Sequence, residues 1–166
     1  MCHSLHVKPS EMPRFICSSN NNISRISKMV NSLCRYYSQP LVFLAPPPSS
    51  EGSVGDQVTQ SYHPFPPPSA LAAPEVSSVL RSLGFGYRAE FIQRTAEMLV
   101  TSHGSKIAQG SCEASEAWLM TLRDVNTSEA REELLKFVGV GRKVADCILL
   151  MSLDKVQSPT RMSPNY

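Results

Sequence analysis

Two closely spaced glycines near the end of the chain, Gly139 and Gly141, constrain its fold more than any other feature. They interrupt a helical pattern that runs through residues 134–147, whose sequence is LLKFVGVGRKVADC. Glycine permits the sharp backbone reversal that joins two helices directly, so this stretch predicts a helix-hairpin-helix. The start of the second helix leaves backbone amides free to bind a phosphate, and Arg142 and Lys143 add positive charge there. The alternative is an ordinary helix–helix turn with two solvated cations.

Apolar spacing predicts helices along most of the remaining chain. Between Ile23 and Tyr37 apolar residues recur three or four positions apart, after a Ser-Asn-Asn-Asn run suited to capping a helix. Nine of the thirteen prolines lie between Pro40 and Pro74, so residues 40–68 are expected to form a long loop. No segment shows strand alternation, and the predicted fold class is therefore all-α. Further helices are expected from Pro74 to Leu83, from Tyr87 to Val100, around a core Trp118, from Asn126 through Phe137 with an Asn-x-x-Glu cap, and from Gly141 to about Lys155.

Composition limits the classes of protein and ligand that remain. A length of 166 residues suffices for one modest domain, and no apolar run approaches the roughly 20 residues of a membrane-spanning helix. Sixteen basic and fourteen acidic residues give a net charge of +2, so a nucleic acid would have to meet a local basic patch. Five scattered cysteines without a CxxC pair indicate reduced thiols of the cytosol or nucleus, and neither a disulfide scaffold nor a zinc site. We therefore expect no cofactor, no metal and no membrane partner.

The last predicted helix carries a lysine and a cysteine on one face. Lys143 and Cys147 lie four residues apart, and residues at this spacing are neighbours on a helix. A lysine on a largely apolar helix can act as an amine nucleophile and form a Schiff base. The simpler alternative, which the spacing alone favours, is a surface lysine above a buried cysteine. The residues expected to point inward from this helix are Val144, Cys147, Ile148 and Met151.

Two further clusters could contact nucleic acid, and each also has a plain structural explanation. Asn20 and Arg25, at the start of the first predicted helix, could read base edges or simply cap the helix. Tyr87 and Arg88 follow the glycine-hinged turn LGFG, where an aromatic ring could stack on or wedge between bases and an arginine could bind a base edge or phosphate. The alternative for this pair is a core tyrosine beside a surface arginine.

Taken together, three segments of the chain resemble the 8-oxoguanine DNA glycosylase/lyase family, in the family's order. They read FICSSNNNISRI at residues 15–26, LGFGYRA at 83–89 and VGVGRKVADC at 138–147. The run YHPFP at 62–66 also fits the family's connection between the first two segments. The resemblance covers residues 15–157, with an insertion across the proline-rich loop, and implies an all-α helix-hairpin-helix glycosylase fold.

The resemblance implies a base-excision repair enzyme that flips 8-oxoguanine opposite cytosine out of duplex DNA and cuts its glycosidic bond. The lysine matching Lys143 forms a Schiff base at the sugar C1′ and permits strand cleavage by β-elimination, and Cys147 matches the residue against one face of the flipped base. The implied partner is double-stranded DNA with the lesion or an abasic site. The residues expected to contact DNA are Asn20, Arg25 and Arg88 at the orphaned cytosine, Tyr87 as a wedge in the vacated stack, and Gly139, Gly141 and Arg142 at the hairpin.

The sequence also departs from the family's pattern. The family carries an essential aspartate after its hairpin helix, whereas residues 158–166 read SPTRMSPNY, with no acidic residue after Asp154. We expect the family's N-terminal β-rich domain and C-terminal helices to be absent, and Val138 and Arg142 replace a proline and a small residue of the family's pattern. Loss of a positioned carboxylate costs orders of magnitude in rate. We therefore expect a truncated or alternatively spliced form, incomplete in fold and impaired in catalysis.

These considerations give the expected domain organisation. Residues 1–14 are expected to be disordered, residues 15–157 to form a partial glycosylase domain around loop 40–68, and residues 158–166 to form a divergent, disordered tail. The alternatives to an impaired enzyme are a non-catalytic module that binds damaged DNA and an inactive truncated isoform. We expect a monomer in the nucleus, with the mitochondrion as the alternative compartment.

Overall fold

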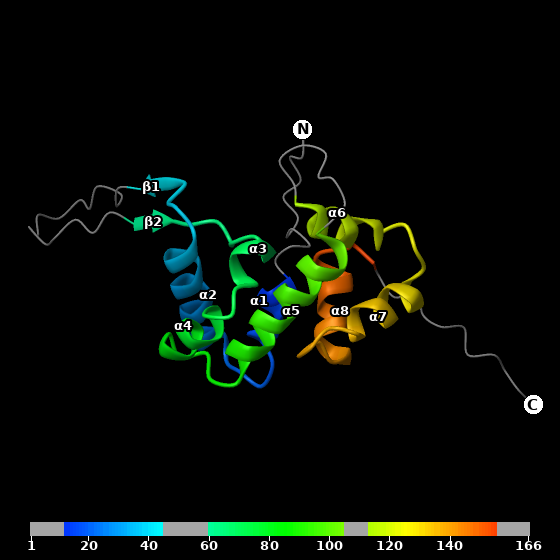
Figure 1. The fold of residues 1–166 in the computed structure, drawn as a ribbon, viewed down its shortest axis with the longest axis horizontal. Coiled ribbons are helices and arrows are strands. Elements are labelled where there is room, and N and C mark those ends of the chain that lie inside the picture. The colour runs from blue at the N-terminus through cyan, green and yellow to red at the C-terminus, as the bar shows by residue number, and fades with distance from the viewer. Residues whose placement is uncertain (1–11, 45–59, 105–112, 156–166) are drawn as a thin grey trace, which may run out of the picture.

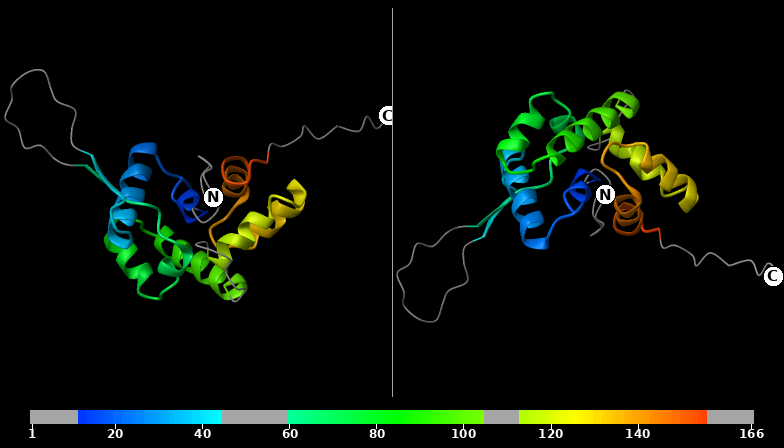
Figure 2. Two further views of the ribbon diagram at one scale, coloured as in Figure 1. Left: turned by 90° about the horizontal axis from the view of Figure 1, so that it is seen from above. Right: turned by 90° about the horizontal axis from the view of Figure 1, so that it is seen from below.

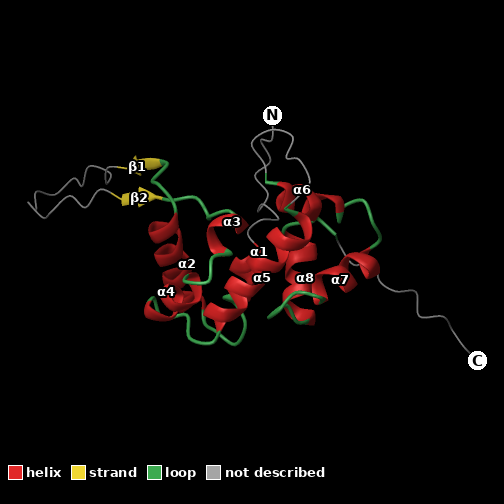
Figure 3. Cartoon of the chain, in the orientation of Figure 1, coloured by secondary structure: helices red, strands yellow, loops and turns green. Residues whose placement is uncertain are grey.

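The protein is represented by a computed structural model that describes residues 12–44, 60–104 and 113–155. Of the N-terminal segment expected to be disordered, only residues 12–14 fall within this part, and the expected tail at 158–166 lies wholly outside it. The described residues form mainly helices, which confirms the all-α prediction (Figures 1 and 3). The elements are α1 (Met12–Ile16), α2 (Ile23–Tyr37), β1 (Val42–Leu44), β2 (Gln60–Tyr62), α3 (Pro68–Leu71), α4 (Val76–Ser82), α5 (Arg88–His103), α6 (Ala114–Thr121), α7 (Thr127–Leu135) and α8 (Arg142–Met151).

Asparagine side chains start two of these helices, as the sequence predicts. The Oδ1 of Asn22 accepts a hydrogen bond of 2.8 Å from the amide of Arg25 at the start of α2. The Oδ1 of Asn126 accepts one of 2.9 Å from the amide of Glu129 at the start of α7. Each bond satisfies an amide that the helix itself leaves without a partner. The observed bounds of α2 match the predicted ones at both ends.

Helix α5 is the central element of the packing. It packs against α1, α3, α4 and α6, while α8 packs against α1 and α7. Seen from above and below, α2 and α4 lie on one side and α7 and α8 on the other, with α1 and α5 between them (Figure 2). Burying apolar surface between these helices is the main source of stability in such a domain. Fully buried side chains along this core include Phe85, Ile92, Leu99, Leu119, Leu134 and Ile148.

A β-hairpin lies within the segment predicted to be a loop. Strands β1 and β2 pair antiparallel, with Val42 opposite Tyr62 and Leu44 opposite Gln60. The prediction of an uninterrupted loop over residues 40–68 is therefore wrong at these six positions and at Pro68, which begins α3. Proline excludes central strands because it cannot donate a ladder hydrogen bond, but the two paired segments, VFL and QSY, contain none.

Helix boundaries differ from the predictions at both ends of the described chain. Residues 12–14, which were expected to be disordered, are part of α1, where Met12 and Pro13 are buried. Helix α8 ends at Met151 and not near Lys155. Met151 was predicted to point inward but is half exposed, and Leu153 is buried in its place. The chain turns back there, with the amide of Leu153 donating to the carbonyl of Ile148.

Trp118 is only partly buried, although it was predicted to be a core residue. Its ring stacks on His103, with 3.7 Å between the ring centroids, and meets Phe137 edge-on.

Among the helices of the described residues, none is long and apolar enough to cross a membrane.

The thiol of Cys17 lies inside the core, directly after α1. It is fully buried, and its Sγ donates to the carbonyl of Pro13 at 3.7 Å. Burial disfavours the thiolate and raises the pKa of Cys17 from 9.0 to about 12, with the charge of Arg88 opposing part of the effect. Because the pKa of Cys17 is higher in the folded protein than in the unfolded chain, its contribution to the free energy of unfolding is fully present below about pH 9. That contribution is lost as the pH rises from about 9 toward 12.

We expect Cys17 to resist alkylation in the folded protein at about pH 8, because the thiolate is the reactive form. Cys147, which is partly exposed, serves as the internal reference. Iodoacetamide treatment followed by peptide mass spectrometry should label Cys147 first, and both residues in denaturant. Equal labelling of the two cysteines in the folded protein would contradict the buried position of Cys17.

Candidate nucleic-acid interface

The predicted helix-hairpin-helix is present, formed by α7 and α8 with the turn between them. Gly139 has a φ of +79°, a conformation that L side chains rarely adopt, and a Cβ there would lie 2.7 Å from Cβ of Phe91. The hydroxyl of Thr95 donates a hydrogen bond of 2.6 Å to the carbonyl of Val138. Val140 is buried beneath the turn. The hairpin is therefore fastened to α5 by a close backbone approach, a hydrogen bond and an apolar anchor.

The start of α8 faces open space. Gly141 is its N-cap residue, without a side-chain cap, and a Cβ at this position would have no heavy atom within 4 Å. The first hydrogen bond of the helix runs from Ala145 to the Gly141 carbonyl, so the preceding amides have no partner within the helix. Arg142 and Lys143 are exposed beside them. An anion is favoured at such a helix start by the amides and by the helix dipole.

The second glycine-hinged turn connects α4 to α5. Gly84 and Gly86 have φ values of +87° and +57°, and the fully buried Phe85 anchors the turn between them. Tyr87 is 52% exposed. Its ring meets that of Phe91 edge-on at 5.7 Å between centroids, and Phe91 in turn contacts Gly139 of the hairpin. One aromatic pair thus joins the second turn to the hairpin.

Arg88 is only 3% exposed, and its guanidinium holds the loop between α1 and α2. Nε and Nη2 both donate to the carbonyl of Ser19, the former at 3.1 Å, and Nη2 also donates to the carbonyl of Asn20 at 3.0 Å. Cζ of Arg88 lies 4.6 Å from the centroid of the Tyr87 ring. The alternative of a core tyrosine beside a surface arginine is therefore wrong, since the arginine is buried and the tyrosine exposed.

The three asparagines of this loop have different roles. Asn20 has an exposed side chain and a φ of +47°, which asparagine tolerates better than most residues. Asn21 donates from Nδ2 to the carbonyl of Cys17 at 3.1 Å, and Asn22 caps α2. Arg25, one turn into α2, donates from Nη2 to the carbonyl of Gly84 at 3.3 Å. Arginine–carbonyl hydrogen bonds thus join the loop and the second turn twice. Arg88 donates to the loop, and Arg25 donates to the turn.

The three segments singled out in the sequence meet along the first half of α5. The turns after α1 and after α4 lie at the same end of the molecule as the hairpin before α8, the lower edge in Figure 1. Phe91 and Thr95, which fasten the hairpin, were not among the predicted site residues. The sequence signal for them is spacing, because Phe91 and Thr95 follow Tyr87 by four and eight residues and residues four apart are neighbours on a helix.

Lys143 and Cys147 occupy successive turns of α8, as predicted. Lys143 is exposed, and Cys147 is partly buried against the core.

Asp146 accepts a hydrogen bond of 2.8 Å from Nε of Arg131 on α7, and these two residues line a shallow cavity of about 420 Å³ between the helices. Arg131 was not among the predicted site residues, because nothing in the local sequence signals a partner fifteen residues away. No group of residues able to hold a metal occurs among the residues described.

The two hairpin glycines should differ in how much an alanine substitution destabilises the protein. Gly139→Ala should lower the free energy of unfolding by about 2–4 kcal/mol, because the new Cβ meets Phe91 in a left-handed conformation. Gly141→Ala should cost about 1 kcal/mol or less, because its Cβ points into open space. Thermal unfolding of the two variants beside the unmodified chain measures the difference. Equal destabilisation would contradict the docking of Gly139 on α5.

Comparison with known proteins identifies the family. A family model described as "HhH-GPD superfamily base excision DNA repair protein" matches residues 14–152. The N-glycosylase/DNA lyase of Saccharomyces cerevisiae is 39% identical over 140 residues, which are 84% of this chain and 33% of that protein. N-glycosylase/DNA lyase OGG1 of Arabidopsis thaliana is 37% identical over 143 residues, 86% of this chain and 32% of that protein.

Solved structures agree with these relatives. The 8-oxoguanine glycosylase/lyase of Clostridium acetobutylicum in its apo-form has a TM-score of 0.66 and 26% identity, covering 90% of this chain and 43% of that one. The same enzyme in complex with double-stranded DNA containing cytosine opposite 8-oxoG has a TM-score of 0.65. This chain spans about a third of the length of the two curated relatives. It belongs to the HhH-GPD superfamily of base excision DNA repair proteins.

Proposed function

We propose that this chain binds double-stranded DNA at 8-oxoguanine opposite cytosine, or at an abasic site, and supplies the lysine of a base-excision glycosylase/lyase. The observation that carries the proposal is the meeting of three turns along one half of α5. The turns present an open helix start, a half-exposed aromatic ring and an exposed asparagine on connected surfaces. A monomeric state and a nuclear or mitochondrial location stay predictions.

The hairpin would hold the DNA backbone. A phosphate at the start of α8 would accept hydrogen bonds from the amides there, with the charge of Arg142 beside it. Tyr87 would fill the gap left by the flipped base. Because Phe91 supports its ring from the edge, inserting the exposed part between bases removes no core contact.

Asn20 and Arg25 would contact the orphaned cytosine. The Asn20 side chain is exposed, and Arg25 has a single exposed hydrogen bond to the Gly84 carbonyl that it can exchange for a base edge. Arg88 has the same role by family resemblance, but in the free chain it binds the carbonyls of Ser19 and Asn20. Its contribution to base reading therefore requires it to give up bonds within the protein.

Lys143 is the proposed nucleophile. At an abasic site its neutral amine attacks C1′ of the sugar aldehyde, water leaves, and an imine joins Nζ to C1′. Loss of a proton from C2′ then expels the 3′-phosphate by β-elimination. Cys147, one turn further along α8 and partly exposed, would line the pocket for the flipped base.

Excision of an intact base places a further demand on the site, because positive charge develops on the sugar and a carboxylate stabilises it. The described carboxylates on α8 and just after it, Asp146 and Asp154, pair with Arg131 at 2.8 Å and Arg123 at 3.4 Å. We therefore propose that the chain reacts with abasic sites more readily than it excises 8-oxoguanine. The same ion pairs favour the second candidate, a module that binds damaged DNA without catalysis.

Borohydride trapping tests the role of Lys143. The purified chain is mixed with a duplex that carries an abasic site opposite cytosine, and with one that carries 8-oxoguanine, in the presence of borohydride. We expect a covalent adduct on the abasic duplex, and at least about a hundredfold less adduct with Lys143→Gln, since only an amine forms the imine.

Arg142→Gln is the matched control, because it removes the neighbouring exposed charge and leaves the amine. It should form the adduct once the DNA concentration is raised to restore binding. An adduct that persists in Lys143→Gln would assign the chemistry to another amine. Binding without an adduct in the unmodified chain would establish the non-catalytic candidate.

A further inference from the structure

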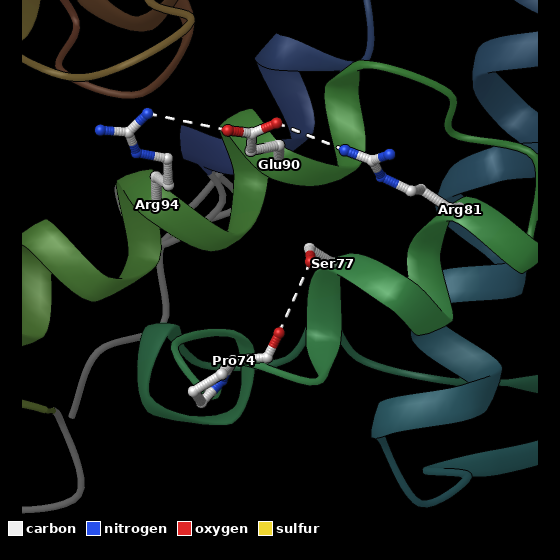
Figure 4. A network of polar contacts seen from close by, with 5 residues as sticks. All are labelled: Pro74, Ser77, Arg81, Glu90 and Arg94. Carbon is white, nitrogen blue, oxygen red and sulfur yellow. Dashed lines mark hydrogen bonds and ion pairs between the residues drawn. The ribbon is translucent and has the colours of Figure 1, made fainter.

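Three charged residues beside the Tyr87 turn have no role in the function proposed above. Glu90, in the first turn of α5, lies between Arg81 at the end of α4 and Arg94 one turn further along α5 (Figure 4). Nη2 of Arg81 lies 3.3 Å from one carboxylate oxygen of Glu90, and Nη1 of Arg94 lies 3.7 Å from the other. One carboxylate thus partly neutralises two guanidinium groups.

This triad is not needed to hold α4 on α5. The side chains of Arg81, Glu90 and Arg94 are 59%, 49% and 57% exposed, and ion pairs at such exposure contribute little to stability. The fully buried Leu80 and Phe85 join these helices instead. Exposed ion pairs are also readily exchanged, because water and salt already weaken them.

The triad borders the surface proposed to bind DNA. Glu90 follows Tyr87 by three residues and directly precedes Phe91, which contacts Gly139 of the hairpin. Arg94 lies three residues beyond Phe91, and residues three or four apart are neighbours on a helix. Arg81 reaches Glu90 from the end of α4, two residues before the glycine turn. Both arginines therefore lie within a turn or two of the groups proposed to meet DNA.

We propose that Arg81 and Arg94 form an additional contact surface for the DNA phosphate backbone, and that Glu90 limits its strength by competing with phosphate for both guanidinium groups. A phosphate offers an arginine the same bidentate geometry as a carboxylate. Binding there exchanges one anion for another and adds affinity without base specificity. The inference rests on the proposed DNA binding and extends it along α4 and α5.

Glu90→Gln tests the competition in the full chain. Binding of a duplex with a tetrahydrofuran abasic analogue opposite cytosine is followed by fluorescence anisotropy at several salt concentrations. At low salt the variant should bind about three- to tenfold more tightly, and the slope of log K against log salt should steepen by about one or two, since each added phosphate contact contributes about 0.9. Glu75→Gln is the control, because it removes the same charge from an exposed residue before the start of α4.

The background Arg81→Gln/Arg94→Gln separates competition from simple repulsion between Glu90 and DNA. If Glu90 acts by holding the arginines, Glu90→Gln gains no affinity in that background. An equal gain in both backgrounds, no gain in either, or the same gain from Glu75→Gln would overturn the proposal. Absence of any binding by the unmodified chain would instead defeat the proposed DNA binding itself, so the two failures are distinguishable.

Discussion

The approach of Gly139 to Phe91 is the contact on which the arrangement of this molecule depends. The hairpin backbone lies so near α5 that a single added carbon would collide with the aromatic ring. The bond from Thr95 to Val138 fixes the same approach one turn further along. Because Phe91 also supports Tyr87, one side chain sets the positions of both the hairpin between α7 and α8 and the exposed Tyr87 ring. A shift of α5 would therefore move both groups together.

Two arginine side chains hold the loop after α1 and the turn before α5 against each other. Arg88 and Arg25 each donate to backbone carbonyls across the gap between two turns, and so hold two irregular segments against each other. Hydrogen bonds from charged groups to carbonyls are stronger than neutral ones. An arginine that both fastens a loop and reads a base must exchange one set of bonds for the other. The base contact proposed for Arg88 would therefore couple DNA binding to release of the loop between α1 and α2.

Much of the fold follows from local sequence signals, and the exceptions have a common cause. The bounds of α2, the asparagine caps and the glycine hairpin depend on residues within one or two helical turns of each other, so spacing predicts them. The burial of Arg88 depends on carbonyls 68 and 69 residues away, and the pairing of β1 with β2 also joins distant segments. Leu153 replaces Met151 in the core because the chain reverses after α8, which the helical pattern does not encode. Local spacing thus predicts the turns and helix starts, while the contacts between distant segments are not encoded locally.

We have proposed that three turns from distant parts of the sequence form one DNA-binding surface. Amide chemical shifts of the isotope-labelled chain, recorded while a duplex with an abasic analogue opposite cytosine is added, test this claim directly. We predict concerted shifts at residues 18–22, 84–88 and 138–143, with β1 and β2 unchanged. Shifts confined to a single turn, or centred on the β-hairpin, would contradict the account.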